Sequence, residues 1–253
     1  MAHTVEAGLR LCAAAERADA KVLVGHHRRH SAIMARACEI VAEGTLGRIV
    51  AVMGRAMFYK PDSYFDEVAW RRQPGGGPIL INMIHEVGNL RSLCGEIVSV
   101  QAFASAAARG FPVEDTVAIN LKFASGALGT FMLSDTAASA RSWEQTSREN
   151  KSYASYPDED CYLVAGTRGS LAIPTMRLKT YPNDAERSWW KPFATAVADL
   201  VEADPLERQL AHFCAIIRGE ATPLVTVRDG LQNLRITAAI AAATRTGLAI
   251  SID

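Results

Sequence analysis

Hydrophobic and polar positions follow a helical period over the first part of the chain. Residues 4–19 place apolar side chains on one face, with Thr4 in position to cap a helix, and residues 31–43 repeat the pattern. Between them the apolar run KVLVGH, residues 21–26, is typical of a short buried strand in a parallel sheet. Helix, strand and helix in this order predict that residues 1–48 are the end of a domain built from βα units.

From residue 49 onward the pattern changes to short strand-like runs separated by Gly or Pro turns. The segment ASGALG, residues 124–129, indicates a hairpin, and strands joined by such short turns usually pair antiparallel. The polar stretch 137–159 is predicted to be a long loop. Two amphipathic helices, at 205–218 and 229–246, close the chain, and each is expected to bury its apolar face.

These elements predict an α+β fold. Residues 49–253 are expected to form an open, mostly antiparallel sheet with helices on one face, preceded by a remnant of a parallel α/β domain over residues 1–48. Because the helices are too few to cover both faces of the sheet, its apolar positions also predict a homo-oligomer, a homodimer or homotetramer that pairs through the open sheet face.

Composition excludes several classes of function. Lysine plus arginine and aspartate plus glutamate number 27 each, so the basic surface that a nucleic acid requires is not expected. The five cysteines are scattered without a Cys-x-x-Cys pair, which argues against a disulfide framework or a zinc ribbon. No apolar run is long enough for a signal peptide or a membrane span, so neither a leader nor membrane binding is predicted, and the expected location is the cytoplasm.

Polar residues interrupt the apolar segment that follows the glycine triplet of WRRQPGGGPILINMIHEVGNLRSLCGE, residues 70–96. On a helix started by Pro78, Asn82, His85 and Asn89 stand at spacing i, i+3 and i+7 and form one stripe. Such a stripe is either satisfied by internal hydrogen bonds or lines a cleft. Imidazole titrates near neutral pH, so in the second case His85 is suited to proton transfer.

The run KPDSYFDEVAWRRQPGGGPILINMIHEVGNLRSLCGEIVSVQA resembles the central signature of the Gfo/Idh/MocA family of NAD(P)-dependent oxidoreductases. In that family a tryptophan–arginine pair precedes a glycine triplet, and the next helix carries a histidine near the reacting carbon. The segment KVLVGHHRRHSAIMARACEIVAEGTLGRIV resembles the end of the family's Rossmann-type nucleotide-binding domain. The run from His212 to Gly247 resembles the family's closing helices.

The resemblance implies hydride transfer between NAD or NADP and a secondary alcohol of a sugar, polyol or related ring compound. In this interpretation His85 is the catalytic base, because it takes or relays the hydroxyl proton. Substrate-binding residues are then Asn82, Asn89, Lys60 and Tyr59, and cofactor-binding residues are Arg29, Trp70 and Arg71. Lys60 and Tyr59 either contact the substrate or belong to an exposed loop. No metal is expected at the GHHRRH cluster, because its two arginines repel a dication.

The sequence also departs from the family pattern. It has no G-x-G-x-x-G fingerprint, whose backbone binds the pyrophosphate, and no Glu-Lys-Pro motif before residue 2. We therefore expect the chain to lack the first βα units of the nucleotide-binding domain, to bind cofactor weakly and to have impaired activity. The alternative is a catalytically silent binding or scaffold protein built from the substrate domain alone.

Overall fold

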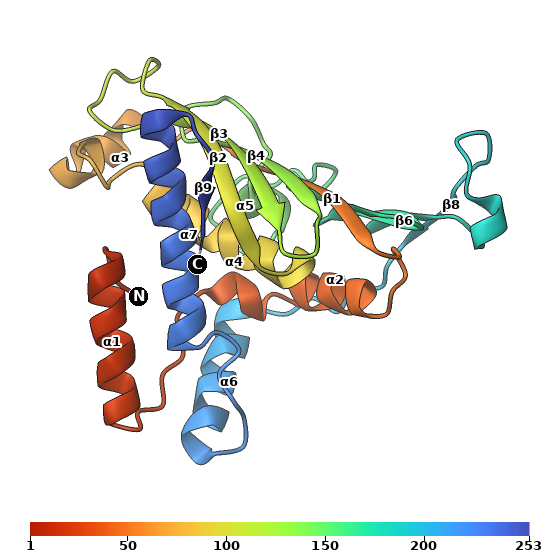
Figure 1. The fold of residues 1–253 in the computed structure, drawn as a ribbon, viewed down its shortest axis with the longest axis horizontal. Helices are drawn as coiled ribbons and strands as arrows, with labels where there is room; N and C mark the ends of the chain where they lie inside the picture. The colour runs from red at the N-terminus through yellow and green to blue at the C-terminus, as the bar shows by residue number, and fades with distance from the viewer. Residues whose placement is uncertain (253) are drawn as a thin grey trace.

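A computed structural model describes residues 1–252, which form a nine-stranded sheet in the order β8-β7-β6-β5-β1-β4-β3-β2-β9 (Figure 1). All neighbouring strands run antiparallel except β1 and β4, which are parallel. The predicted α+β class and the open, mostly antiparallel sheet are therefore confirmed. The strands are β1 Ile49–Met57, β2 Ile97–Ser105, β3 Thr116–Phe123, β4 Leu128–Ser134, β5 Tyr162–Gly166, β6 Gly169–Ile173, β7 Arg177–Thr180, β8 Ala194–Val197 and β9 Ile250–Ser251.

One face of the sheet carries the core. The helices that pack there are α2 Ala32–Ala42, α4 Ile84–Cys94 and α7 Val227–Thr246, with α7 lying beside β2 (Figure 1). Large side chains from both layers are fully buried, among them Met34 of α2, Leu90 of α4 and Phe123 of β3. The other face is open, and Met53, Phe103 and Leu128 are exposed on it.

Shorter or outlying helices surround this core. Figure 1 shows that α1 and α6 extend away from the sheet, with α1 packed against α7, and that β8 belongs to a projecting arm. They are α1 Val5–Arg17, α3 Asp62–Asp66, α5 Trp143–Thr146 and α6 Pro205–Arg218, with 3₁₀ turns η1 His27–His30, η2 Ala69–Arg72 and η4 Asp184–Glu186.

Helix starts follow the predicted caps. The Thr4 hydroxyl accepts a hydrogen bond from the third residue after it, and the Ser31 hydroxyl does the same for α2. At α7 Thr226 and Asp229 form a full capping box, so this helix begins two residues before the predicted start. The hairpin at 124–129 and the long loop at 137–159, interrupted only by α5, are also confirmed.

Two predictions about the outlying segments are wrong. Residues 21–26 are not a strand, because no described strand runs beside them and only the Val24 N–H bonds across to another segment, at Val225 O. On α6 the predicted buried face is turned outward, with Leu206 60% and Leu210 65% exposed. This helix packs through its other side against η1, and its apolar side has no covering element within the described residues.

The predicted helix from Pro78 is two helices of different pitch. Ile79–Met83 form a π-helical turn, η3, and the α-helix α4 starts only at Ile84. A π turn holds more residues than an α turn, so the helical pitch changes between Asn82, which lies in η3, and His85 and Asn89, which both lie in α4.

Candidate functional site

His85 lies in a cluster of imidazole rings. Its ring centroid is 5.2 Å from that of His26 and 5.8 Å from that of His27, which η1 carries to the start of α4. Burial lowers the pKa of His85 to about 3, and the nearby positive charge of Arg28 adds to this effect. Burial likewise lowers the pKa of His26 to about 4. Both imidazoles are therefore neutral at pH 7.

The buried Nδ1 atom of His85 has no hydrogen-bond partner among the described residues. A buried polar atom without a partner is uncommon in a folded protein, and it distinguishes this ring from a structural histidine tied to the main chain. As a neutral imidazole with a free nitrogen, His85 can accept a hydrogen bond from a hydroxyl group. Its low pKa makes it a weak base, so it is better suited to relaying a proton than to holding one.

A buried charged network lies directly behind this cluster. Arg28 is 3% exposed, and its guanidinium donates to the carboxylates of Glu86 and Glu144. Tyr162 donates its hydroxyl to the second oxygen of Glu86, and Asn89 Nδ2 donates to Tyr162 Oη at 3.1 Å. Sequence reasoning missed this network. Its one signal was a glutamate within an apolar helix, next to the histidine of interest.

Asn89 differs from the other predicted substrate contacts in its burial, and its role in substrate binding stays a prediction. It is fully buried, and its side-chain Nδ2 donates to Tyr162 Oη on the core side of α4.

Lys60 and Asn82 form a second polar cluster. Lys60 Nζ donates to Asn82 Oδ1 at 2.9 Å and pairs with Asp135 at 3.3 Å. Arg109 also pairs with Asp135, and it donates to the Lys60 carbonyl at 2.7 Å. Burial lowers the pKa of Lys60, although the charge of Asp135 opposes the shift. Lys60 is thus a largely buried ammonium with Asn82 at its tip, rather than a residue of an exposed loop.

Two other predicted contacts, Tyr59 and Arg71, adjoin the Lys60 cluster, because Lys60 Nζ also lies 5.0 Å from the Tyr64 ring centre. Tyr59 is 55% exposed and faces the Arg109 guanidinium at 5.1 Å. Arg71 stacks on the Tyr64 ring at 3.8 Å and pairs with Glu67.

The two remaining predicted cofactor contacts, Trp70 and Arg29, lie on different 3₁₀ turns. Trp70 is 53% exposed on η2, and Arg29 lies on η1, where it faces Cys38. The structure records no contact that joins Arg29 to Trp70 or Arg71.

A cavity of about 520 Å³ opens beside the histidine cluster. His27 forms one wall, α5 and the loop after it form another, and the start of α6 forms a third. α5 contributes Glu144, the loop after it contributes Tyr153, and Leu206 of α6 and its N-cap Asp204 complete the lining. The predicted loop at 137–159 therefore borders a cavity that reaches His27, the ring in contact with His85.

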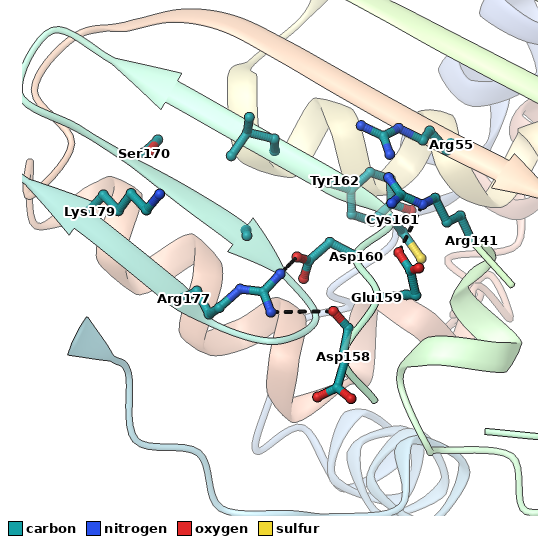
Figure 2. Close-up of a pocket in the computed structure, with 12 residues that line it drawn as sticks. Arg55, Arg141, Asp158, Glu159, Asp160, Cys161, Tyr162, Ser170, Arg177 and Lys179 are labelled. Carbon is teal, nitrogen blue, oxygen red and sulfur yellow. Dashed lines mark hydrogen bonds and ion pairs between the residues drawn. The ribbon is translucent and has the colours of Figure 1, made fainter. Parts of the chain in front are cut away.

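A cavity of about 500 Å³ lies on the open face of the sheet, across β1, β5, β6 and β7 (Figure 2). Its charges are largely paired: Arg141 with Glu159 at 2.8 Å, and Arg177 with Asp160 at 2.5 Å. None of the predicted site residues lines it.

The described residues do not fit a dinucleotide. The sequence has no G-x-G-x-x-G, residues 21–26 form no strand, and β1 and β4 are the sole parallel pair within residues 1–252. A pyrophosphate site of the usual kind needs a strand, a glycine turn and a helix N-terminus in sequence.

No helix in the described range has the apolar length needed to cross a bilayer.

Comparison with known proteins relates this chain to a family. Residues 34–172 match the model of the GFO/IDH/MocA C-terminal domain. The 1,5-anhydro-D-fructose reductase of Ensifer adhaerens is 26% identical over 266 residues, an alignment that spans 100% of this chain and 71% of the relative.

Two solved structures share the fold. The WlbA dehydrogenase from Bordetella pertussis, in complex with NADH and UDP-GlcNAcA, is 22% identical with a TM-score of 0.73 over 100% of this chain and 69% of its own. A levoglucosan dehydrogenase, in complex with NADH and levoglucosan, is 19% identical with a TM-score of 0.77 over 99% of this chain and 71% of its own. Since the domain model covers more than half of the sequence, this chain belongs to the Gfo/Idh/MocA oxidoreductase family.

Proposed function

We propose that this chain serves an NAD(P)-dependent oxidoreductase that interconverts a secondary alcohol and a ketone on a sugar, polyol or related ring compound. The observation that carries the proposal is the cavity beside His27, with the neutral, unpartnered His85 in ring contact behind it. The Ensifer adhaerens relative is a 1,5-anhydro-D-fructose reductase, and one structural neighbour is a dehydrogenase in complex with NADH and levoglucosan. Both support the same reaction class.

In this proposal His85 takes or relays the hydroxyl proton, and His27 connects it to the cavity. Asn82 orients a substrate hydroxyl. The Lys60 ammonium, which donates to Asn82 in the structure, donates to a substrate oxygen when substrate is bound. Asp135 holds this ammonium in place, because its carboxylate lies 3.3 Å from Lys60 Nζ. Tyr59, Trp70, Arg71 and Arg29 are proposed as outer contacts of the substrate and cofactor.

We propose further that residues 1–48 and 49–253 belong to different domains. The open backbone of 21–26 and the exposed Leu206 and Leu210 of α6 support this division, because both suit contact with further α/β structure. Residues 49–253 then form the substrate-binding and oligomerisation domain.

The open sheet face is proposed to pair two copies of the chain. Met53, Phe103 and Leu128 are exposed there, and Trp189 and Trp190 are 86% and 83% exposed on the projecting arm. Light scattering of the purified chain at micromolar concentration tests this, with a dimer or tetramer as the expected mass. A monomer at every concentration contradicts it.

Calorimetric titration with NADH and NADPH tests the oxidoreductase directly. Because the usual pyrophosphate site is missing from the described residues, we expect weak but measurable cofactor binding. We also expect slow turnover of at least one polyol from a panel that varies ring size and hydroxyl configuration. His85→Gln is expected to reduce turnover about a hundredfold, the usual loss on removing a general base. His3→Gln, which changes an exposed histidine before α1, is the matched control and should retain full turnover.

A binding or scaffold protein is the second candidate, and the missing G-x-G-x-x-G favours it. It predicts polyol binding in the calorimeter with no heat from either cofactor at millimolar concentration. That result refutes the oxidoreductase for this chain and leaves the cavity as a ligand site.

A further inference from the structure

Arg28 is the most deeply buried cation whose role the proposed reaction leaves open. Its side chain is 3% exposed and lies between two carboxylates, Glu86 on α4 and Glu144 on α5. One Nη atom donates to each carboxylate, which is the forked geometry that guanidinium offers and ammonium does not.

Burial of such a charge needs an explanation other than stability. Desolvating ions costs several kcal/mol each, and apolar replacements of buried ion pairs are often neutral or stabilising. The Arg28–Glu86 ion pair has further hydrogen bonds on its other side. Tyr162 donates to the remaining oxygen of Glu86, and the Tyr162 hydroxyl accepts a hydrogen bond from Asn89. The network is thus arranged for fixed geometry, with Glu86 restrained through both oxygens.

The three segments that meet at Arg28 are the ones that shape the candidate site. Arg28 follows His27 directly on η1, and Glu86 follows His85 directly on α4. Glu144 stands on α5, where it lines the same cavity as His27. A single guanidinium therefore links the segment of His27, the segment of His85 and the loop that borders the cavity.

We propose that Arg28 is a positioning residue: by bridging Glu86 and Glu144 it holds the 27–30 turn against α4 and keeps the His27 ring in contact with His85. This inference rests on the proposed function for its purpose, since the contact connects the cavity to the proton carrier. The arrangement of the rings does not depend on any cofactor or substrate.

Neighbouring charges do not replace Arg28 in this role. Arg29 is next to it in sequence, but its guanidinium faces Cys38 Sγ at 3.9 Å and pairs with no carboxylate among the described residues. His26 also touches His85, and its Nδ1 lies 3.1 Å from Asn233 Nδ2 on α7, so that ring has a separate anchor. The His27 ring has no recorded hydrogen bond of its own, so we expect its place to depend on the turn.

The experiment uses the full chain with ¹³C-labelled histidine, without cofactor or substrate. Ring-to-ring cross-relaxation between His27 and His85 reports the contact, and the chemical shift of His85 against pH reports its pKa. Arg28→Lys keeps the positive charge but can no longer donate from two separate nitrogens to Glu86 and Glu144. Glu144→Gln removes the negative charge from one of these two partners, a side chain that is 26% exposed. Arg29→Lys is the control.

In both test variants the cross-relaxation should fall at least about twofold, because neither a lysine ammonium nor a guanidinium with one remaining carboxylate partner fixes the 27–30 turn. As the ring becomes hydrated, the pKa of His85 should rise from about 3 toward 6.5. Arg29→Lys should change neither quantity.

If Arg28→Lys and Glu144→Gln leave the cross-relaxation and the pKa of His85 as in the wild type, while lowering only the unfolding temperature, Arg28 is structural and the proposal is overturned. Because no turnover is measured, failure of the oxidoreductase activity leaves this result unaffected.

Discussion

Acidification provides a quantitative test of whether His85 is buried as a neutral ring. In the unfolded chain the imidazole takes up a proton below its ordinary pKa of 6.5, whereas burial lowers the pKa in the folded chain to about 3. Between these values the unfolded state binds more protons than the folded state. Stability is thus intact above pH 6.5 and is lost as the pH falls through this window.

The magnitude follows from the proton linkage. Each pH unit inside the window costs about 1.4 kcal/mol, so at about pH 5 the penalty from His85 alone is about 2 kcal/mol relative to about pH 7.5. His26, whose pKa burial also lowers, adds a loss of the same sign. A substitution that removes only the His85 imidazole therefore isolates its share.

Urea unfolding followed by tryptophan fluorescence at the two pH values measures the effect. In His85→Gln the loss of unfolding free energy on acidification should be smaller than in the wild type by about 2 kcal/mol. The exposed His3→Gln is the control and should show the wild-type loss. Equal losses in His85→Gln and the wild type would show that His85 is hydrated in the folded protein, and would refute both its burial and its assigned role.

Three further substitutions test the packing around the site. Tyr162→Phe removes the donor to the buried Glu86 and should lower the free energy of unfolding by about 1–3 kcal/mol in urea titrations, and an unchanged midpoint contradicts the network. Gly54→Ala should cost about 1–3 kcal/mol, because its Cβ would lie 2.3 Å from the Phe131 ring, and a higher melting temperature would refute that contact. Thr226→Ala should cost about 0.5–2 kcal/mol through loss of the capping box, measured by calorimetry, with Thr226→Ser expected to restore it.

Elements with strong local signals were predictable from the sequence. Thr4 caps the first helix as its position indicated, and the glycine-containing turn at 124–129 joins an antiparallel pair. These features depend on residues within a few positions of one another, which a periodic pattern records. The resemblance to the Gfo/Idh/MocA family rested on the run around His85, and the domain match confirmed the family.

The features that were missed depend on distant residues or on backbone geometry. Arg28 and Glu86 are separated by 58 positions, so neither neighbourhood revealed that their charges would meet inside the protein. The strand predicted at 21–26 had the right composition, but a strand also needs a neighbour, and composition cannot supply one. The π turn before α4 likewise has no reliable pattern, so the sequence predicted a single helix where the structure has two segments of different pitch.

The position of β1 has a consequence for how the chain folds. This strand comes first in sequence, yet it lies between β4 and β5, pairing parallel with one and antiparallel with the other. The strands on its two sides, β2-β3-β4 and β5-β6-β7-β8, are meanders whose pairings are mostly short-range, and short-range contacts form quickly. Joining them requires β1 to close loops of some seventy or more residues on one side and over a hundred on the other, which is entropically slower. Insertion of β1 should therefore be the late step that makes the two halves unfold as one unit.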